Sequence, residues 1–140
     1  MIRPTLCGLL VVFTLAAGCE RPAPEATEDP EAAARLFATA AYVGAGSTLF
    51  KMLEPADQAT MKTRAAAINE AAGADVVEPA DLFVSQGFAP RHIKTVKRMD
   101  DGSNPDEAHV SIEGHFDKSW TLHLVRAEGT WRVRLHGAGG

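Results

Sequence analysis

Residues 109–136 read HVSIEGHFDKSWTLHLVRAEGTWRVRLH, and this stretch decides the fold. Apolar and polar side chains alternate from 109 to 116, and the same period of two returns at 120–125 and at 131–136. Such alternation is typical of a strand with one face buried and the other exposed to water. The sequence therefore predicts consecutive antiparallel strands joined by short turns.

The last turn fixes which side chains of the final two strands face each other. A two-residue turn at 128–129 sets Leu124 opposite Val133 and Leu122 opposite Leu135. This register keeps the apolar residues on one face of the sheet. We therefore expect all four of these side chains to point toward the helices.

The preceding turn must obey the same rule. A three-residue turn at 117–119 sets Phe116 opposite Trp120 and Ile112 opposite Leu124, whereas a two-residue turn would mix the two faces. The sequence therefore predicts the three-residue turn.

The second face of the predicted sheet is polar. Its candidate functional residues are Glu113, His115, His123, Arg134 and His136. The registers above place Glu113, His123 and Arg134 in one row, with His115 and His136 diagonal to His123. Three imidazoles can bind zinc, but these side chains stand parallel on one face beside a fixed guanidinium charge. We therefore predict a solvated or partner-facing surface with no metal.

The chain before residue 91 has helical periodicity. Asp29 can cap a helix over 30–42, and Pro30 is tolerated in its first turn. Gly44 and Gly46 end this helix. Its apolar stripe consists of Ala33, Leu36, Phe37, Ala40 and Ala41.

Two more helices follow this one. Ser47 can cap the first of them, and Pro55 separates it from the second, which Gly73 ends. The apolar stripe of the second consists of Met61, Ala65, Ile68 and Ala72. Pro79–Val84 is predicted to be a short helix or turn.

A weaker strand is predicted over 91–99. Its apolar residues Ile93, Val96 and Met99 do not keep one parity. Helices followed by about four antiparallel strands indicate an α+β fold, with N-terminal helices packed on a curved sheet.

Residues 30–136 resemble the nuclear transport factor 2-like superfamily, a cystatin-like roll, and in particular its small bacterial lipoproteins. The resemblance is carried by the helix Pro30–Tyr42, the helical segment 53–72, and the closing pattern WTLHLVR at 120–126 with GTWRV at 129–133. It implies a concavity between sheet and helices. The early hairpin that the family often has could come only from 74–78.

Six aromatic residues are candidates to line that concavity. They are Phe37, Phe50, Phe83, Phe88, Trp120 and Trp131. They either fill the space as core or surround an open ligand pocket, and the sequence leaves both interpretations open.

The sequence contains no motif of a known catalytic or phosphate-binding site, so we assign no catalytic residue and no cofactor. Enzymes that the chain resembles place an Asp or His deep in an apolar pocket. Asp57 and Asp81 are the carboxylates considered for that role, although a surface loop is the expected position of both.

The amino terminus contains a predicted targeting signal. Leu15-Ala16-Ala17-Gly18-Cys19 closes an apolar run over 6–17, which is shorter than the ~20 residues needed to span a bilayer and suits a signal peptide. The segment resembles the lipobox of bacterial lipoproteins, which implies cleavage before Cys19 and acylation of that residue. The alternative is an ordinary secretory signal that happens to end in cysteine.

With this targeting signal, the chain is predicted to have four parts. Residues 1–18 are the predicted signal peptide, 19–29 a disordered tether rich in proline and charge, 30–136 the domain and 137–140 a flexible tail. Cys7 leaves with the signal peptide, so no disulfide is expected.

Charge excludes some partners. The chain has 14 Lys and Arg against 18 Asp and Glu, and the excess of acid is concentrated in the tether. A nucleic-acid partner and polybasic membrane attachment are therefore not expected. The basic residues Arg91, Lys94, Lys97 and Arg98 form a cluster that is read as a solvated strand face, with a patch for an anionic partner as the alternative.

These features predict a lipid-anchored protein of the bacterial cell envelope. Glu20 after the cysteine resembles sorting to the outer membrane of a Gram-negative host, facing the periplasm. The domain is predicted to bind an envelope protein or a small apolar ligand without catalysis. The alternatives are a small isomerase, cyclase or hydratase, and a module that forms homodimers through the outer face of its sheet.

Overall fold

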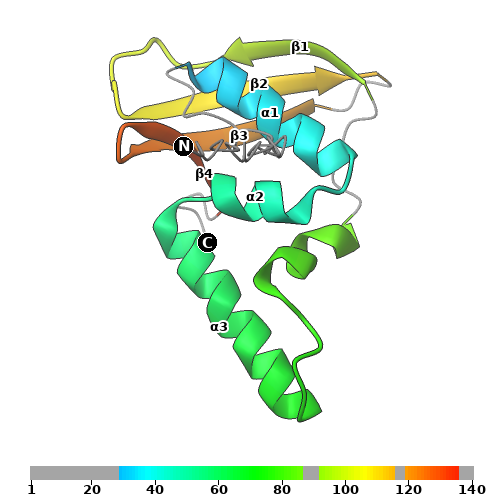
Figure 1. Ribbon diagram of the computed structural model, residues 1–140. Helices are drawn as coiled ribbons and strands as arrows, with labels where there is room; N and C mark the ends of the chain where they lie inside the picture. Colours follow the sequence, from blue (N-terminus) through cyan, green and yellow to red (C-terminus); the bar gives the residue numbers. More distant parts are fainter. Residues whose placement is uncertain (1–28, 87–91, 116–118, 136–140) are drawn as a thin grey trace, which may run out of the picture.

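The computed structural model describes residues 29–86, 92–115 and 119–135. The helices are α1 (Pro30–Tyr42), α2 (Gly46–Met52), α3 (Pro55–Ala72) and the 3₁₀ helix η1 (Pro79–Gln86). The strands are β1 (Ile93–Arg98), β2 (Glu107–Gly114), β3 (Ser119–Ala127) and β4 (Thr130–Arg134). They form one antiparallel sheet in the order β1-β2-β3-β4 (Figure 1). The predicted α+β fold, with the helices before the sheet, is confirmed.

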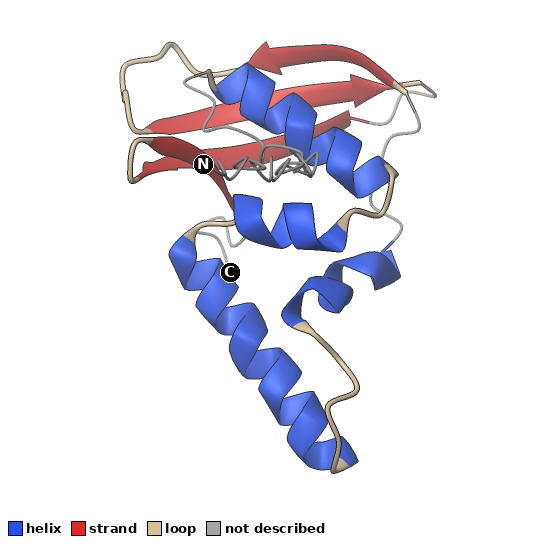
Figure 2. Cartoon of the chain, in the orientation of Figure 1, coloured by secondary structure: helices blue, strands red, loops and turns tan. Residues whose placement is uncertain are grey.

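Helix α1 lies across one face of the sheet and contacts all four strands (Figure 2). The carboxylate of Asp29 accepts hydrogen bonds from the backbone N–H groups of Glu31 and Ala32, at 3.1 and 3.2 Å. This is the predicted cap, and the helix has the predicted bounds. The side chains that α1 buries include Ala33, Ala34, Phe37, Ala38 and Ala40.

The core lies between α1, α2 and the inner face of the sheet. The largest side chains that are fully buried there are Leu53, Val110, Ile112, Leu124 and Val133. On β2, buried residues alternate with more exposed ones along the whole strand. The alternation that predicted the sheet is therefore the pattern that builds its core.

The register between β3 and β4 confirms one predicted pair and corrects another. Leu124 faces Val133, as expected. Leu135 does not face Leu122, because the sheet pairing ends at Arg134 and the Leu135 side chain is 42% exposed. Its backbone N–H donates instead to Asp57 Oδ2, at 2.7 Å. The residue that follows β4 is therefore bound to α3 instead of continuing the pairing with β3.

The register between β2 and β3 differs from the prediction. Ile112 faces Trp120 rather than Leu124, and Ala108 faces Leu124. This register, like the predicted one, keeps apolar residues opposite apolar residues, so the pattern alone could not separate the two. The predicted three-residue turn at 117–119 is therefore wrong, because Ser119 already belongs to β3 and faces Glu113. Trp120 was expected opposite Phe116, which lies outside the described ranges, but it faces Ile112.

Strand β1 has an irregularity that explains its broken parity. Ile93 faces Gly114, but the register then shifts, so that Thr95 faces Glu113 and Val96 faces Ile112. A bulge of this kind inserts one residue and switches the face on which later side chains lie.

Helix α2 begins two residues earlier than predicted, because its cap position is Ala45 rather than Ser47. Ala45 occupies the cap position and makes no side-chain hydrogen bond there. An added Cβ at Gly46 would lie 2.6 Å from the Ala80 carbonyl oxygen of η1. Glycine is therefore required where α2 meets η1.

Helix α3 has the predicted bounds but buries only its first half. It ends at Gly73, whose φ of 68° suits glycine. Met61 and Ala65 are buried, whereas Ile68 is 41% exposed and Ala72 is exposed, so the second half of the predicted stripe is wrong. This half projects away from the sheet (Figure 1). Residues 74–78 form no strand and return along α3 to η1.

Candidate functional site

A cluster of charged and imidazole side chains occupies the outer face of the sheet. This sheet-face cluster consists of Glu54, Glu107, His109, His123 and Arg134. His109 on β2 lies directly opposite His123 on β3. Their ring centroids are 4.5 Å apart and the ring planes differ by 9°, so the two imidazoles stack.

Arg134 joins three parts of the fold within this cluster. Its Nε lies 2.9 Å from Oε1 of Glu54, the residue just before α3. Its Nη1 lies 3.3 Å from Oε1 of Glu107 on β2. The hydrogen bond to Glu54 raises the pKa of Arg134 above its ordinary value, with the charge of Glu107 adding to the effect. The guanidinium is therefore committed to two carboxylates of the chain itself.

His123 is the unusual member of the cluster. Its Nε2 atom is buried without a hydrogen-bond partner and lies 4.0 Å from Glu107 Oε2. Burial lowers the pKa of His123 below its ordinary value, and the neighbouring His109 and Arg134 lower it further, against the opposing effect of Glu107. The arrangement disfavours a positive charge on this imidazole near neutral pH.

We expect His123 to make the domain sensitive to mild acid. Because the folded state binds this proton less readily than the unfolded chain, stability is lost as the pH falls below about 6.5 toward the lowered pKa of the folded state. Urea unfolding between pH 7.5 and pH 5.5 measures the loss, and His123→Gln should reduce it. His115→Gln, which alters an exposed imidazole outside the cluster, is the control. An equal slope in wild type and His123→Gln would contradict the role of His123.

The structure brings together only part of the predicted polar face. His123 and Arg134 are neighbours, but Glu113 lies opposite Ser119 and its carboxylate accepts a hydrogen bond from Thr95 Oγ1, at 3.2 Å. The row expected to join Glu113 to His123 is therefore not formed, because the observed register puts His109 there instead.

The structure describes one of the other two imidazoles of the predicted face. His115 packs edge-on against His92, with ring centroids 5.6 Å apart, and His136 lies outside the described residues. In the described ranges, no group of three His, Cys, Asp or Glu side chains is arranged to hold a metal ion.

Sequence reasoning missed Glu107 and His109 as partners of His123. The predicted alternation begins at residue 109, whereas β2 already begins at Glu107. The sequence feature that could have predicted this earlier start is Ala108, an apolar residue that extends the alternation by two residues toward the amino terminus.

Asp57 was expected in a surface loop, and this prediction is wrong. It lies in the first turn of α3 and is 4% exposed, and its carboxylate accepts the N–H of Leu135. Asp81 is exposed and accepts the N–H of Glu78, at 2.8 Å. Asp57 therefore links α3 to a residue far away in the sequence, whereas Asp81 holds the backbone just before and within η1.

The aromatic candidates lie in or against the core where their side chains are described. Phe37 and Trp131 belong to the core, and Phe50 and Trp120 pack against it. The side chain of Phe83 and the whole of Phe88 lie outside the described part of the structure.

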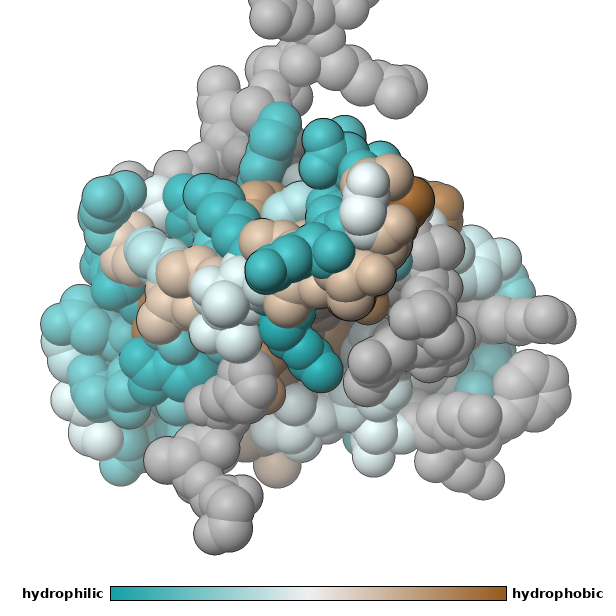
Figure 3. Space-filling view, turned by 90° about the horizontal axis from the view of Figure 1, so that it is seen from below, coloured by the Kyte–Doolittle hydropathy of each residue, from teal (hydrophilic) through white to brown (hydrophobic). Residues whose placement is uncertain are grey.

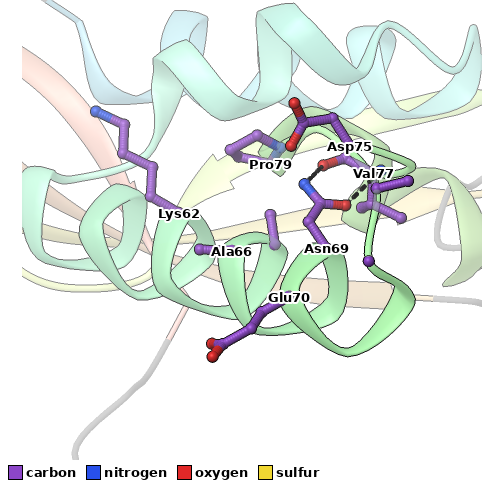
Figure 4. A pocket seen from close by; sticks show the side chains of 10 residues that line it. Lys62, Ala66, Asn69, Glu70, Asp75, Val77 and Pro79 are labelled. Atoms are coloured by element: carbon purple, nitrogen blue, oxygen red, sulfur yellow. Dashed lines mark hydrogen bonds between the residues drawn. The ribbon is translucent and has the colours of Figure 1, made fainter.

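A groove lies elsewhere, between the projecting half of α3 and the segment that follows it (Figure 4). Its volume is about 650 Å³. The groove is lined by Lys62, Ala65, Ala66, Asn69, Glu70, Gly73, Ala74, Asp75, Val77 and Pro79. Seen from the end where α3 projects, hydrophilic and apolar residues are interspersed over the described surface (Figure 3).

Asn69 holds the two walls of the groove together. Its Oδ1 accepts the N–H groups of Val76 and Val77, and its Nδ2 donates to the Val77 carbonyl, all at 2.9 Å. The floor is made of small side chains, because alanine and glycine face the returning segment.

The two surfaces differ in what they offer chemically. The charges of the sheet-face cluster are paired within the fold, whereas the groove presents a mixed lining with unlike charges at its rim. No protein-family model matches this chain, and no curated protein or solved structure matches it either.

Proposed function

We propose that this chain is a lipid-anchored protein of the bacterial cell envelope, attached through Cys19, whose domain binds another envelope protein without catalysis. The observation that carries the binding role is the filled space between α1 and the sheet. Val110, Ile112 and Leu124 have no exposed surface there. An enzyme of the kind that the sequence resembles would need an open pocket at this place, with an acid or base inside it.

A protein partner fits this interior better than a small apolar ligand does. The buried residues that β2, β3 and β4 turn toward α1 are apolar and pack against Phe37 and Leu53. Binding then depends on the outer surfaces of the domain. The groove beside α3 is a concave surface of the described residues that offers a small apolar ligand an alternative place to bind.

The spacing between Cys19 and helix α1 suits a lipid anchor. Asp29 caps α1, and the Pro30 side chain in its first turn is buried. A tether from Cys19 to this cap reaches at most about 35 Å when fully extended, so the acylated residue can sit in a membrane while the domain stands clear of it. Within the described ranges, no helix is long and apolar enough to cross a membrane.

Metabolic labelling with a palmitate analogue tests the anchor. The wild-type chain should incorporate the label and fractionate with the outer membrane, because acylation of Cys19 supplies its attachment. Cys19→Ala should lose both the label and the outer-membrane position. Cys7→Ala, which changes the other cysteine of the chain, should behave as wild type. Label that persists in Cys19→Ala, or a wild-type chain that takes up none, would show that Cys19 is not the lipid site.

A further inference from the structure

We propose that the outer edge of β1 is a docking site for an extended acidic segment of a protein partner, which adds to the sheet as a further strand. This inference rests on the proposed binding function and names its surface and the chemistry of its partner. It is carried by the edges of the sheet, the direction of the β1 backbone groups and the charges along the strand.

The fold protects one edge of its sheet and leaves the other open. Beside β4, Leu53 forms a parallel bridge with Val133, and the N–H of Glu54 donates to the Val133 carbonyl, at 3.0 Å. Arg132 also donates to the carbonyl of Lys51 on that side. β1 lies at the opposite end of the strand order, and no strand within the described ranges pairs with its outer side (Figure 1). An open edge of this kind is a template for pairing with another chain.

The backbone of β1 directs hydrogen-bonding groups outward. The N–H of Met99 donates to the His109 carbonyl, at 2.8 Å, so residues of the same parity in β1 turn their backbone groups toward β2. The backbone N–H and C=O groups of Val96 and Arg98 therefore point away from β2, toward the open edge of the sheet. The N–H of Arg98 already binds Glu31 Oε1, at 2.8 Å. A carboxylate of α1 thus occupies one outward position of the edge, and Val96 offers the next.

The charges along β1 select the chemistry of the partner. Lys94 and Lys97 are exposed, while Arg98 is paired with Asp100. Lysines on an edge strand oppose pairing with a like-charged strand, so a second copy of β1 is disfavoured because its lysines would face these. An extended segment that alternates Glu or Asp with apolar residues instead gains an ion pair with each lysine as its backbone pairs. The same lysines therefore exclude a second copy and recognise an acidic strand.

Fluorescence anisotropy with a labelled peptide of sequence Val-Glu-Val-Glu-Val-Glu tests the docking site on the full-length chain in detergent micelles. We expect saturable binding that Lys94→Glu/Lys97→Glu weakens by about tenfold or more, equivalent to about 1.4 kcal/mol. Arg64→Glu, which reverses an exposed charge on α3, should leave binding unchanged. A peptide with lysine in place of each glutamate should not bind.

Backbone pairing has its own readout. Amide hydrogen exchange at Val96 should slow when the peptide is added, and a peptide of the same sequence with N-methylated backbone should bind much more weakly. Equal binding of the N-methylated peptide would mean that charge alone attracts it, which overturns strand addition. Absence of binding, an unchanged affinity in the double lysine variant, or dimers of the free chain that pair through β1 would overturn the proposal as well. Labelling of Cys19 is independent of all these outcomes, so failure of the anchor and failure of the docking site are distinguishable.

Discussion

Leu124→Ala is expected to lower the free energy of unfolding by about 2–5 kcal/mol, a large part of the stability of a domain of this size. Leu124 is 0% exposed, and it faces Val133 on one side and Ala108 on the other. Removing its side chain takes apolar surface out of the core and leaves a cavity, because neighbours held in two strands can relax only partly. Urea unfolding followed by circular dichroism measures the loss.

Leu135→Ala is the matched control for this substitution. It removes the same atoms from the residue that follows β4, at a site that is 42% exposed, and it leaves the backbone N–H that donates to Asp57. Its effect should stay within about 0.5 kcal/mol, as at other surface positions. Similar losses in the two variants would mean that Leu124 does not have the buried position assigned to it here.

The period of two predicted the sheet and its buried face, but not the register. Alternation fixes only whether an odd or an even residue points inward, and both registers considered for β2 and β3 satisfy it. The correct one depends on Ala108, a small residue whose burial opposite Leu124 extends β2 to Glu107. Tertiary packing therefore decided a question that the pattern left open.

Alternation also fails where long side chains lie over a strand. Val125 shares the polar face with His123, yet it is 6% exposed. Its cross-strand neighbours are Glu107 and Arg132, whose long side chains carry apolar stems. A helical wheel has the same weakness, because Ile68 continues the apolar stripe of α3 and yet is 41% exposed.

The sheet-face cluster could be predicted only in part for a related reason. His123 and Arg134 follow from the two-residue turn between their strands, which is a local feature. The stacking of His123 on His109 and its approach to Glu107 depend on the register between β2 and β3. The buried position of Asp57 depends on where α3 meets the end of β4, a contact between segments far apart in the sequence.

Asp57→Ala is expected to lower the free energy of unfolding by about 2–4 kcal/mol. Its carboxylate accepts the N–H of Leu135 at 2.7 Å, and a hydrogen bond to a charged group contributes about 1.5–3 kcal/mol. It also lies in the first turn of α3, where a negative charge near the helix amino terminus adds about 0.3–1 kcal/mol. The substitution therefore removes the link between α3 and the end of β4 together with a favourable charge.

Two further variants separate these contributions. Asp57→Asn keeps an oxygen that can accept the Leu135 N–H but removes the charge, so it should lose less stability than Asp57→Ala. Asp75→Ala removes an exposed carboxylate after α3 and should change stability by no more than about 0.5 kcal/mol. Amide exchange at Leu135 should accelerate in Asp57→Ala and change little in Asp75→Ala, because only the first variant frees that N–H. If Asp57→Ala proved as mild as Asp75→Ala, with slow exchange at Leu135, the link between α3 and β4 would have to be carried by Glu54 and Arg134 instead.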